Sequence, residues 1–72
     1  MVLDKNNQQS DAVANLYRAA FSLARGSRKV GLKFLEKAKA ALGIKLEPVL
    51  KSRADDLYWA EKILDQYHQS RF

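Results

Sequence analysis

The chain has 72 residues, a formal net charge of +5 and no cysteine. This length allows one small domain, and the lack of cysteine excludes disulfide bonds and the thiolate ligands of most structural zinc sites. A content of 47% apolar and 29% charged residues is typical of a soluble folded domain. No apolar run approaches the roughly 20 residues that span a bilayer, so we expect a cytoplasmic protein that does not use a membrane.

The N-terminal segment is polar and gives way to a helical pattern. Residues 1–9 carry too little apolar surface to pack, so we expect a flexible arm. Ser10 or Asp11 is a suitable N-cap for a helix over about residues 11–25. At about 100° per residue, the apolar surface of this helix covers more than half of its circumference. A surface of that width must be covered on two sides, which favours self-association as a homodimer.

A second helix is predicted over about residues 28–42. Gly26 suits the end of the preceding helix, Ser27 suits the N-cap of this one, and Gly43 suits its C-terminal end. The predicted buried stripe consists of Val30, Phe34, Leu35, Ala38, Ala41 and Leu42.

A third helix is predicted over about residues 48–69, because proline is favoured in the first turn of a helix and Pro48 lies there. A second possibility is that Ser52 caps a new helix, with Asp55 three residues later as in a capping box. The predicted inner face consists of Leu50, Ala54, Leu57, Ala60, Ile63, Leu64 and Tyr67.

These elements predict an all-α fold. No segment alternates apolar and polar residues for long enough to predict a strand, and no Asn-Gly or Asp-Gly hairpin turn occurs. Short connections bring neighbouring helices together in opposite directions. Residues 10–72 therefore predict a single domain, a small antiparallel three-helix bundle that self-associates.

The residues that catalysis needs are few. The lone imidazole, His68, lies near the C-terminus, where a histidine is better explained by a hydrogen bond to a neighbour than by catalysis. Asp55 and Asp56 are adjacent, so on a helix they point about 100° apart and cannot form a close acid–base pair. The glycines are isolated, which excludes a nucleotide-binding loop. We therefore expect no enzymatic activity, no metal and no cofactor.

Basic residues concentrate in one part of the chain. Residues 26–45 carry six basic residues and one acidic residue, which equals the whole net charge. A patch of this kind can bind phosphates of nucleic acid or an acidic protein, although lysines also serve simply to keep a helix face solvated. The candidate basic patch consists of Arg25, Arg28, Lys29, Lys33 and Lys37.

Three residues form a candidate interface. Leu32 falls among polar positions of the second helix, and Trp59 falls opposite the inner face of the third, so both are expected at the surface. Two alternatives for Trp59 are that its ring covers the stem of Lys62, or that the helix has a different phase near Ser52. Glu61 falls inside the apolar arc, where it lies at the rim of the core, pairs with a basic residue of another helix, or marks an interface.

The function expected from these observations is that of a small interaction or regulatory module that works through helix–helix contacts, as a homodimer or with a protein partner. The alternative is a regulator that binds nucleic-acid phosphates through the basic second helix. Salt-sensitive binding distinguishes the second function from the first.

Overall fold

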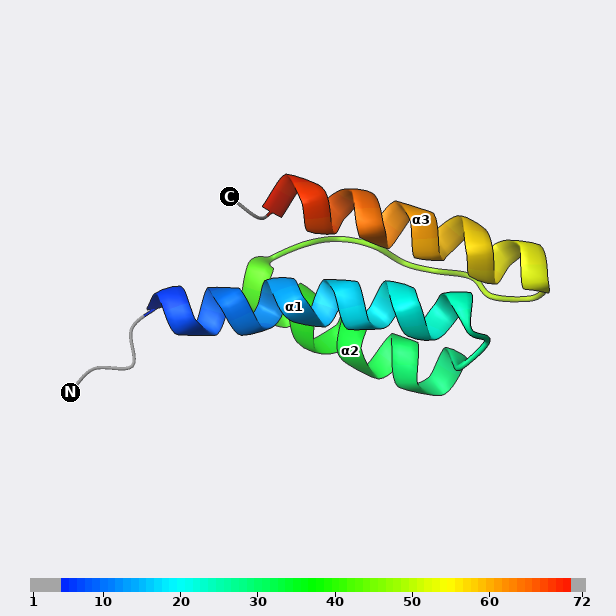
Figure 1. Cartoon of the computed structure of the whole chain (residues 1–72), viewed down its shortest axis with the longest axis horizontal. Helices are drawn as coiled ribbons and strands as arrows, with labels where there is room; N and C mark the ends of the chain where they lie inside the picture. The colour runs from blue at the N-terminus through cyan, green and yellow to red at the C-terminus, as the bar shows by residue number, and fades with distance from the viewer. Residues whose placement is uncertain (1–4, 71–72) are drawn as a thin grey trace.

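The chain folds into three helices, shown in Figure 1 as a computed structural model that describes the backbone of residues 5–70 and the side chains of residues 11–70. The helices are α1 (Lys5–Ala24), α2 (Arg28–Leu42) and α3 (Arg53–Ser70). α1 packs against both other helices. Residues 5–70 contain no strand, so the predicted all-α three-helix bundle is confirmed.

Both helix pairs that pack closely are antiparallel. Figure 1 shows α2 and α3 running in the direction opposite to α1. The connection over residues 43–52 causes this arrangement, because it runs back along the length of the bundle before α3 begins. α2 and α3 therefore run in the same direction, joined by an extended segment. The prediction that a short connection makes these two helices antiparallel is wrong, because the segment spans the length of the bundle before α3 begins.

The core is centred on α1. Its buried residues Ala12, Leu16, Ala19 and Leu23 follow one another in alternating steps of four and three, the spacing of one helix face. The largest fully buried side chains are Leu16, Leu23, Leu35 and Ile63. All the other buried apolar residues in the described part of the chain are alanines. The core is therefore narrow, and α1 and α3 meet through small side chains such as Ala20 and Ala60.

α1 begins at Lys5, earlier than the predicted start at Asp11. The segment from Lys5 to Ala24 contains no glycine or proline, and lysine and glutamine are good helix formers, so the helix has no reason to stop near Ser10. Ser10 and Asp11 are thus inside the helix and not at its N-cap. The rest of the predicted arm, residues 1–4, lies outside the described residues.

The predicted helix ends at Gly26 and Gly43 are confirmed. Gly26 has a φ of 91°, and the backbone N–H of Ser27 donates to the carbonyl of Ser22 while that of Gly26 donates to Leu23, the pattern of a Schellman motif. Gly43 ends α2 with a φ of 69°. Ser27 precedes α2 as predicted, but its side chain makes no capping hydrogen bond.

α1 and α2 approach closely at Gly31. A Cβ atom at this position would lie 2.9 Å from two side-chain carbons of Leu23 and 3.2 Å from the carbonyl oxygen of Ala19. The buried positions of α2 are Gly31, Leu35 and Ala38. The stripe predicted for this helix is correct for Leu35 and Ala38 but wrong for Val30 and Ala41, which are exposed because the helix turns Gly31 toward α1.

The segment over residues 44–51 is extended and alternates in exposure. Ile44, Leu46 and Leu50 pack against the core and Pro48 is also partly buried, whereas Lys45, Glu47 and Val49 are exposed. Pro48 lies in this segment, so the helix predicted to begin there is wrong. A strand-like alternation of side chains lets the segment cover the core without forming a helix.

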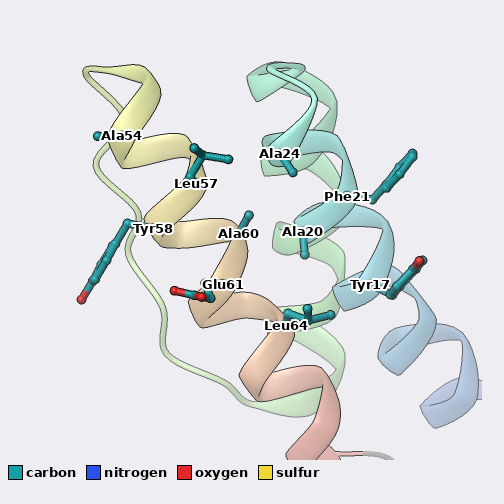
Figure 2. Close-up of a pocket in the computed structure, with 10 residues that line it drawn as sticks. All are labelled: Tyr17, Ala20, Phe21, Ala24, Ala54, Leu57, Tyr58, Ala60, Glu61 and Leu64. Carbon is teal, nitrogen blue, oxygen red and sulfur yellow. The ribbon is translucent and has the colours of Figure 1, made fainter.

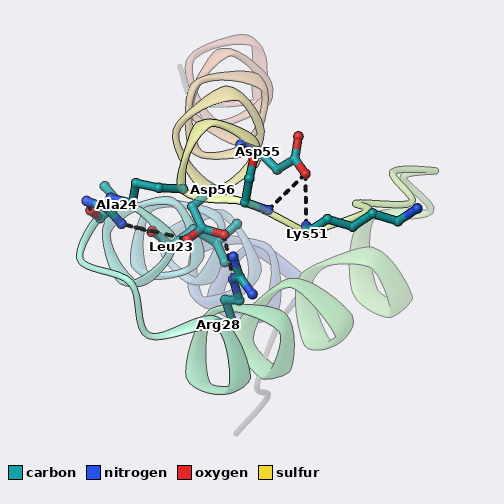
Figure 3. Close-up of polar contacts among 8 residues, drawn as sticks. Leu23, Ala24, Arg28, Lys51, Asp55 and Asp56 are labelled. Atoms are coloured by element: carbon teal, nitrogen blue, oxygen red, sulfur yellow. Dashed lines mark hydrogen bonds and ion pairs between the residues drawn. The ribbon is translucent and has the colours of Figure 1, made fainter.

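α3 begins after Ser52, which confirms the second possibility considered for this helix. The backbone N–H of Asp55 donates to the Ser52 Oγ at 3.2 Å, and the backbone N–H of Ser52 donates to the Asp55 Oδ2 at 3.1 Å. The same carboxylate accepts from the backbone N–H of Lys51 at 2.8 Å (Figure 3). This reciprocal pair is a capping box that satisfies backbone donors at the helix start.

Candidate functional site

At one end of the bundle, a buried carboxylate of α3 is paired with a side chain of α2. The Asp56 side chain is 4% exposed, and its Oδ1 accepts from the Arg28 Nε at 2.7 Å (Figure 3). Arg53 lies on the other side, with its Nη1 3.8 Å from the Asp56 Oδ2. A buried carboxylate needs such partners, since an unpaired charge in the interior costs several kcal/mol. Asp56 therefore has to face α2, and this requirement sets the rotation of α3.

Arg53 also connects α3 to the end of α1. Its guanidinium donates to the carbonyl of Leu23 at 3.3 Å and to that of Ala24. These carbonyls belong to the last turn of α1, where the helix dipole favours a positive charge. The start of α3 is thus fixed against both other helices by polar contacts, and the apolar contacts follow from that placement.

The rotation of α3 turns Trp59 toward the core. Trp59 and Leu32 are both partly buried and pack against the core cluster, so their predicted position at the exposed surface is wrong. The alternative that the helix has a different phase near Ser52 accounts for Trp59. Lys62 covers a different ring, since its Nζ lies 5.5 Å from the centre of Tyr58.

An open apolar groove lies between α1 and α3. It has a volume of about 690 Å³ and is shown in Figure 2. Four alanines line it, Ala20 and Ala24 from α1 and Ala54 and Ala60 from α3. Because none of these side chains reaches far, the space between the two helices is left open. The remaining lining residues are Tyr17, Phe21, Leu57, Tyr58, Glu61 and Leu64.

Large apolar side chains border this α1–α3 groove and are half exposed. The exposed fractions are 50% for Tyr17, 52% for Phe21, 49% for Leu57 and 53% for Tyr58. The rings of Tyr17 and Phe21 are stacked, with centroids 6.4 Å apart, and the guanidinium of Arg25 lies 5.2 Å from the centre of the Phe21 ring. The groove therefore has an ordered aromatic wall on α1 rather than isolated exposed residues.

Glu61 is the one predicted interface residue that lines the groove. Its side chain is exposed and lies on the α3 side, pointing away from α1 in Figure 2. None of the ion pairs within residues 11–70 involves it. Of the interpretations considered for Glu61, pairing with a basic residue of another helix has no counterpart among residues 11–70.

The five residues of the candidate basic patch fall into two groups in the structure. Arg28 is paired with Asp56, and Arg25 lies over the Phe21 ring. The other three members are exposed on α2 and form no ion pair with any described residue. We call Lys29, Lys33 and Lys37 the lysine row; their spacing of four residues places them along one side of the helix.

The aspartates and the histidine that the sequence singles out do not lie together in the structure. Asp55 and Asp56 separate as predicted, the first capping the backbone and the second pairing with arginine. His68 is exposed, with its ring centroid 5.3 Å from that of Tyr67. Residues 11–70 hold no cluster of three metal-ligating side chains. No helix in the part of the chain that the structure describes is long and apolar enough to cross a bilayer.

Leu57 and Tyr58 are half exposed beside the groove, so the predicted place of Leu57 on the inner face is wrong. A helix that begins at Pro48 puts Leu57 on the same face as Leu50. The capping pair Ser52 and Asp55 is the signal that identifies the true start, and a buried Asp56 then places Leu57 beside the groove.

Comparison with known proteins gives no relative: the chain matches no family model, no curated protein and no solved structure.

Proposed function

We propose that the protein is a non-enzymatic interaction module that binds an amphipathic helix in the α1–α3 groove. The observation that carries this proposal is the half exposure of Tyr17, Phe21, Leu57 and Tyr58 around one apolar groove. A buried aromatic side chain removes about 150–250 Å² from water, so these four residues leave roughly 350 Å² exposed. Apolar patches of that size on small proteins are commonly interaction sites.

Charged residues stand at both edges of the groove. Arg25 lies over the Phe21 ring at the α1 edge, and the α3 edge carries Glu61 together with Lys62, whose Nζ lies over the Tyr58 ring. A helix that fits here presents apolar residues to the groove and an acidic residue above Arg25. A charge contact of this kind fixes the orientation of a bound helix more than it raises its affinity.

The proposal is tested by NMR titration with a designed helical peptide. The peptide has about 20 residues, enough for a stable helix, with a leucine face and the acidic residue described above. The control peptide has the same composition with the leucine face disrupted. We expect amide shifts at Ala20, Leu57 and Leu64 with the first peptide only. No shift with the first peptide contradicts the proposal.

Matched variants locate the binding site. Leu57→Glu places a charge in the groove and should abolish the shifts. Val30→Glu makes the same kind of change at a residue that is 48% exposed on α2 and does not line the groove, so binding should persist. An equal loss of peptide binding in both variants contradicts binding in the groove.

A second candidate function rests on the lysine row, whose three exposed cations have no ion-pair partner in residues 11–70. Through these lysines the protein would bind nucleic-acid phosphates without base specificity. The test measures binding to a mixed-sequence duplex across salt concentrations. It compares the double variant Lys33→Glu/Lys37→Glu, which alters the lysine row, with the control Lys45→Glu/Lys51→Glu, which changes the net charge equally. Only a loss of duplex binding confined to the first variant supports binding through the lysine row.

A further inference from the structure

We propose that the phosphate-binding surface of this protein extends from α2 onto α1, where Arg18 joins the lysine row, and that it binds the backbone of a nucleic-acid duplex. This inference rests on the second of the proposed functions, binding through the lysine row. It adds a binding residue to that surface and names the class of nucleic acid. No residue of α2 lines the α1–α3 groove, so the two surfaces are separate.

The side chain of Arg18 is held on the side of α1 that faces α2. Its Nη1 donates to the Asn15 Oδ1 at 2.9 Å. Asn15 and Lys37 line the same open hollow between α1 and α2, which has a volume of about 540 Å³. Arg18 therefore lies on the same side of the bundle as Lys37. The hydrogen bond to Asn15 uses one N–H donor of the guanidinium and leaves the others for a ligand.

Arg18 also lies at the level of the lysine row along the bundle. Leu23 of α1 lies against Gly31 of α2, and these two helices are antiparallel. At a rise of about 1.5 Å per residue from this contact, Arg18 lies about 7.5 Å along α1, and Lys33 and Lys37 lie about 3 Å and about 9 Å along α2. The guanidinium thus widens the row between the levels of its last two lysines.

Two exposed acidic residues limit this basic surface. Asp11 lines the same hollow as Lys37, about two helical turns from Arg18 along α1. Glu36 lies about 100° around α2 from Lys37, on the flank away from the hollow. Neither forms an ion pair with a described residue. Arg18 and the three lysines exceed these two acids, and an excess of positive charge on one face attracts a polyanion.

The surface has the features of a site for a duplex rather than for a single strand. Within residues 11–70, the exposed tyrosine and phenylalanine rings are those of Tyr17, Phe21 and Tyr58, and all three line the α1–α3 groove. The large apolar side chain exposed on α2 is Val30, which has no ring. Proteins that bind single strands stack the bases on aromatic side chains. Cations without such rings favour the phosphates of a paired backbone.

The test measures the affinity of the full chain for three nucleic acids by fluorescence anisotropy, as salt rises from about 50 to about 200 mM. The probes are a mixed-sequence DNA duplex of about 20 base pairs, an RNA duplex of the same sequence, and one DNA strand alone. Each phosphate contact contributes about −0.9 to the slope of log affinity against log salt, so four cations predict a slope of about −3.6 for the DNA duplex. Its affinity should then fall about 150-fold over this range.

Single-charge variants test the place of Arg18 in the surface. Arg18→Gln should reduce the slope to about −2.7 and the fall in affinity to about 40-fold, and Lys33→Gln should have the same effect. The matched control is Lys62→Gln, which removes one charge from an exposed position of α3. Its slope should equal that of the wild type. Circular dichroism checks that each variant is folded.

The outcomes separate this inference from the function on which it rests. A lower slope in Lys33→Gln with a wild-type slope in Arg18→Gln retains binding through the lysine row and overturns the role of Arg18. A single strand bound as tightly as the duplexes overturns the choice of a duplex. Tighter binding of either duplex supports that choice, and the tighter of the two identifies DNA or RNA. No binding of any probe at about 50 mM salt rejects both proposals.

Discussion

Alanines line both sides of α1, yet they allow a close contact with α2 and leave a groove beside α3. On the α2 side, Leu23 fills the space over Gly31, with its side-chain carbons 2.9 Å from where a Cβ would be. On the α3 side, Ala20 and Ala24 meet other alanines, and a volume of about 690 Å³ is open. Small residues thus bring helices together only where the opposite helix contributes a side chain large enough to occupy the gap.

The α1–α2 contact is broken most strongly by Leu23→Ala. Leu23 is fully buried, so we expect a loss of about 2.7–5 kcal/mol in the free energy of unfolding. Leu57→Ala removes the same atoms at the half-exposed edge of the groove and should cost less than about 1 kcal/mol. Urea unfolding at low protein concentration measures both, and equal losses contradict the difference between the two sides of α1.

The polar contact that rotates α3 is tested by Arg28→Met. The substitution leaves Asp56 buried with only Arg53 nearby, so we expect a loss of about 2–4 kcal/mol. The control is Lys39→Met, which removes an ion pair with Glu47, a side chain that is 85% exposed. This pair should contribute less than about 1 kcal/mol. Thermal unfolding compares the two, and a similar loss in both contradicts a special role for Asp56.

Gly31→Ala sharpens the comparison at the closest approach. The added methyl group crowds Leu23, which costs about 1–3 kcal/mol, while the better helix propensity of alanine returns up to about 1 kcal/mol. We expect a net loss of about 1 kcal/mol. In the background of Leu23→Ala the crowding is absent, so the same substitution should become neutral or stabilising. Additive losses in a double-mutant cycle contradict a contact between these side chains.

Ala24→Leu should have the smallest effect on stability and the opposite sign. Its side chain enters the groove, where we expect a gain of about 0.5–1 kcal/mol from filling the open space. The same side chain occupies the place of the proposed bound helix, so binding of the leucine-faced peptide should weaken. A loss of stability shows that the groove has no room for a larger residue.

Local signals in the sequence predicted much of this fold. Gly26 and Gly43 end their helices because a left-handed conformation suits glycine, and that requirement is read from neighbouring residues alone. The buried face containing Leu16 and Leu23 follows from helical spacing. The start predicted for the third helix at Pro48 is wrong, because proline suits both a first helical turn and an extended segment. Ile44 and Leu46 alternate with Lys45 and Glu47 in the sequence, but this alternation is too short to predict an extended segment by itself.

The candidate site was harder to predict, because it depends on residues far apart in the sequence. Asp56 faces inward only because Arg28, 28 residues away, is there to pair with it. No helical wheel assigns a carboxylate to the core. Once Asp56 is buried, Trp59 turns toward the core and Leu57 toward the groove. The exposure of Tyr17 and Phe21 agrees better with the sequence. The apolar surface predicted for the first helix is wide, which indicates that two neighbouring helices do not cover all of it.

The extended segment over residues 44–51 also bears on the order in which the molecule assembles. α1 and α2 are joined by a short turn, so their contacts close small loops and form early. α3 must wait until the segment has crossed the whole length of that hairpin, and its docking closes a longer loop. The wall of the groove that α3 supplies is thus the part of the molecule expected to open first and close last. If the groove binds a helix as proposed, release of that helix can draw on the same reversible opening.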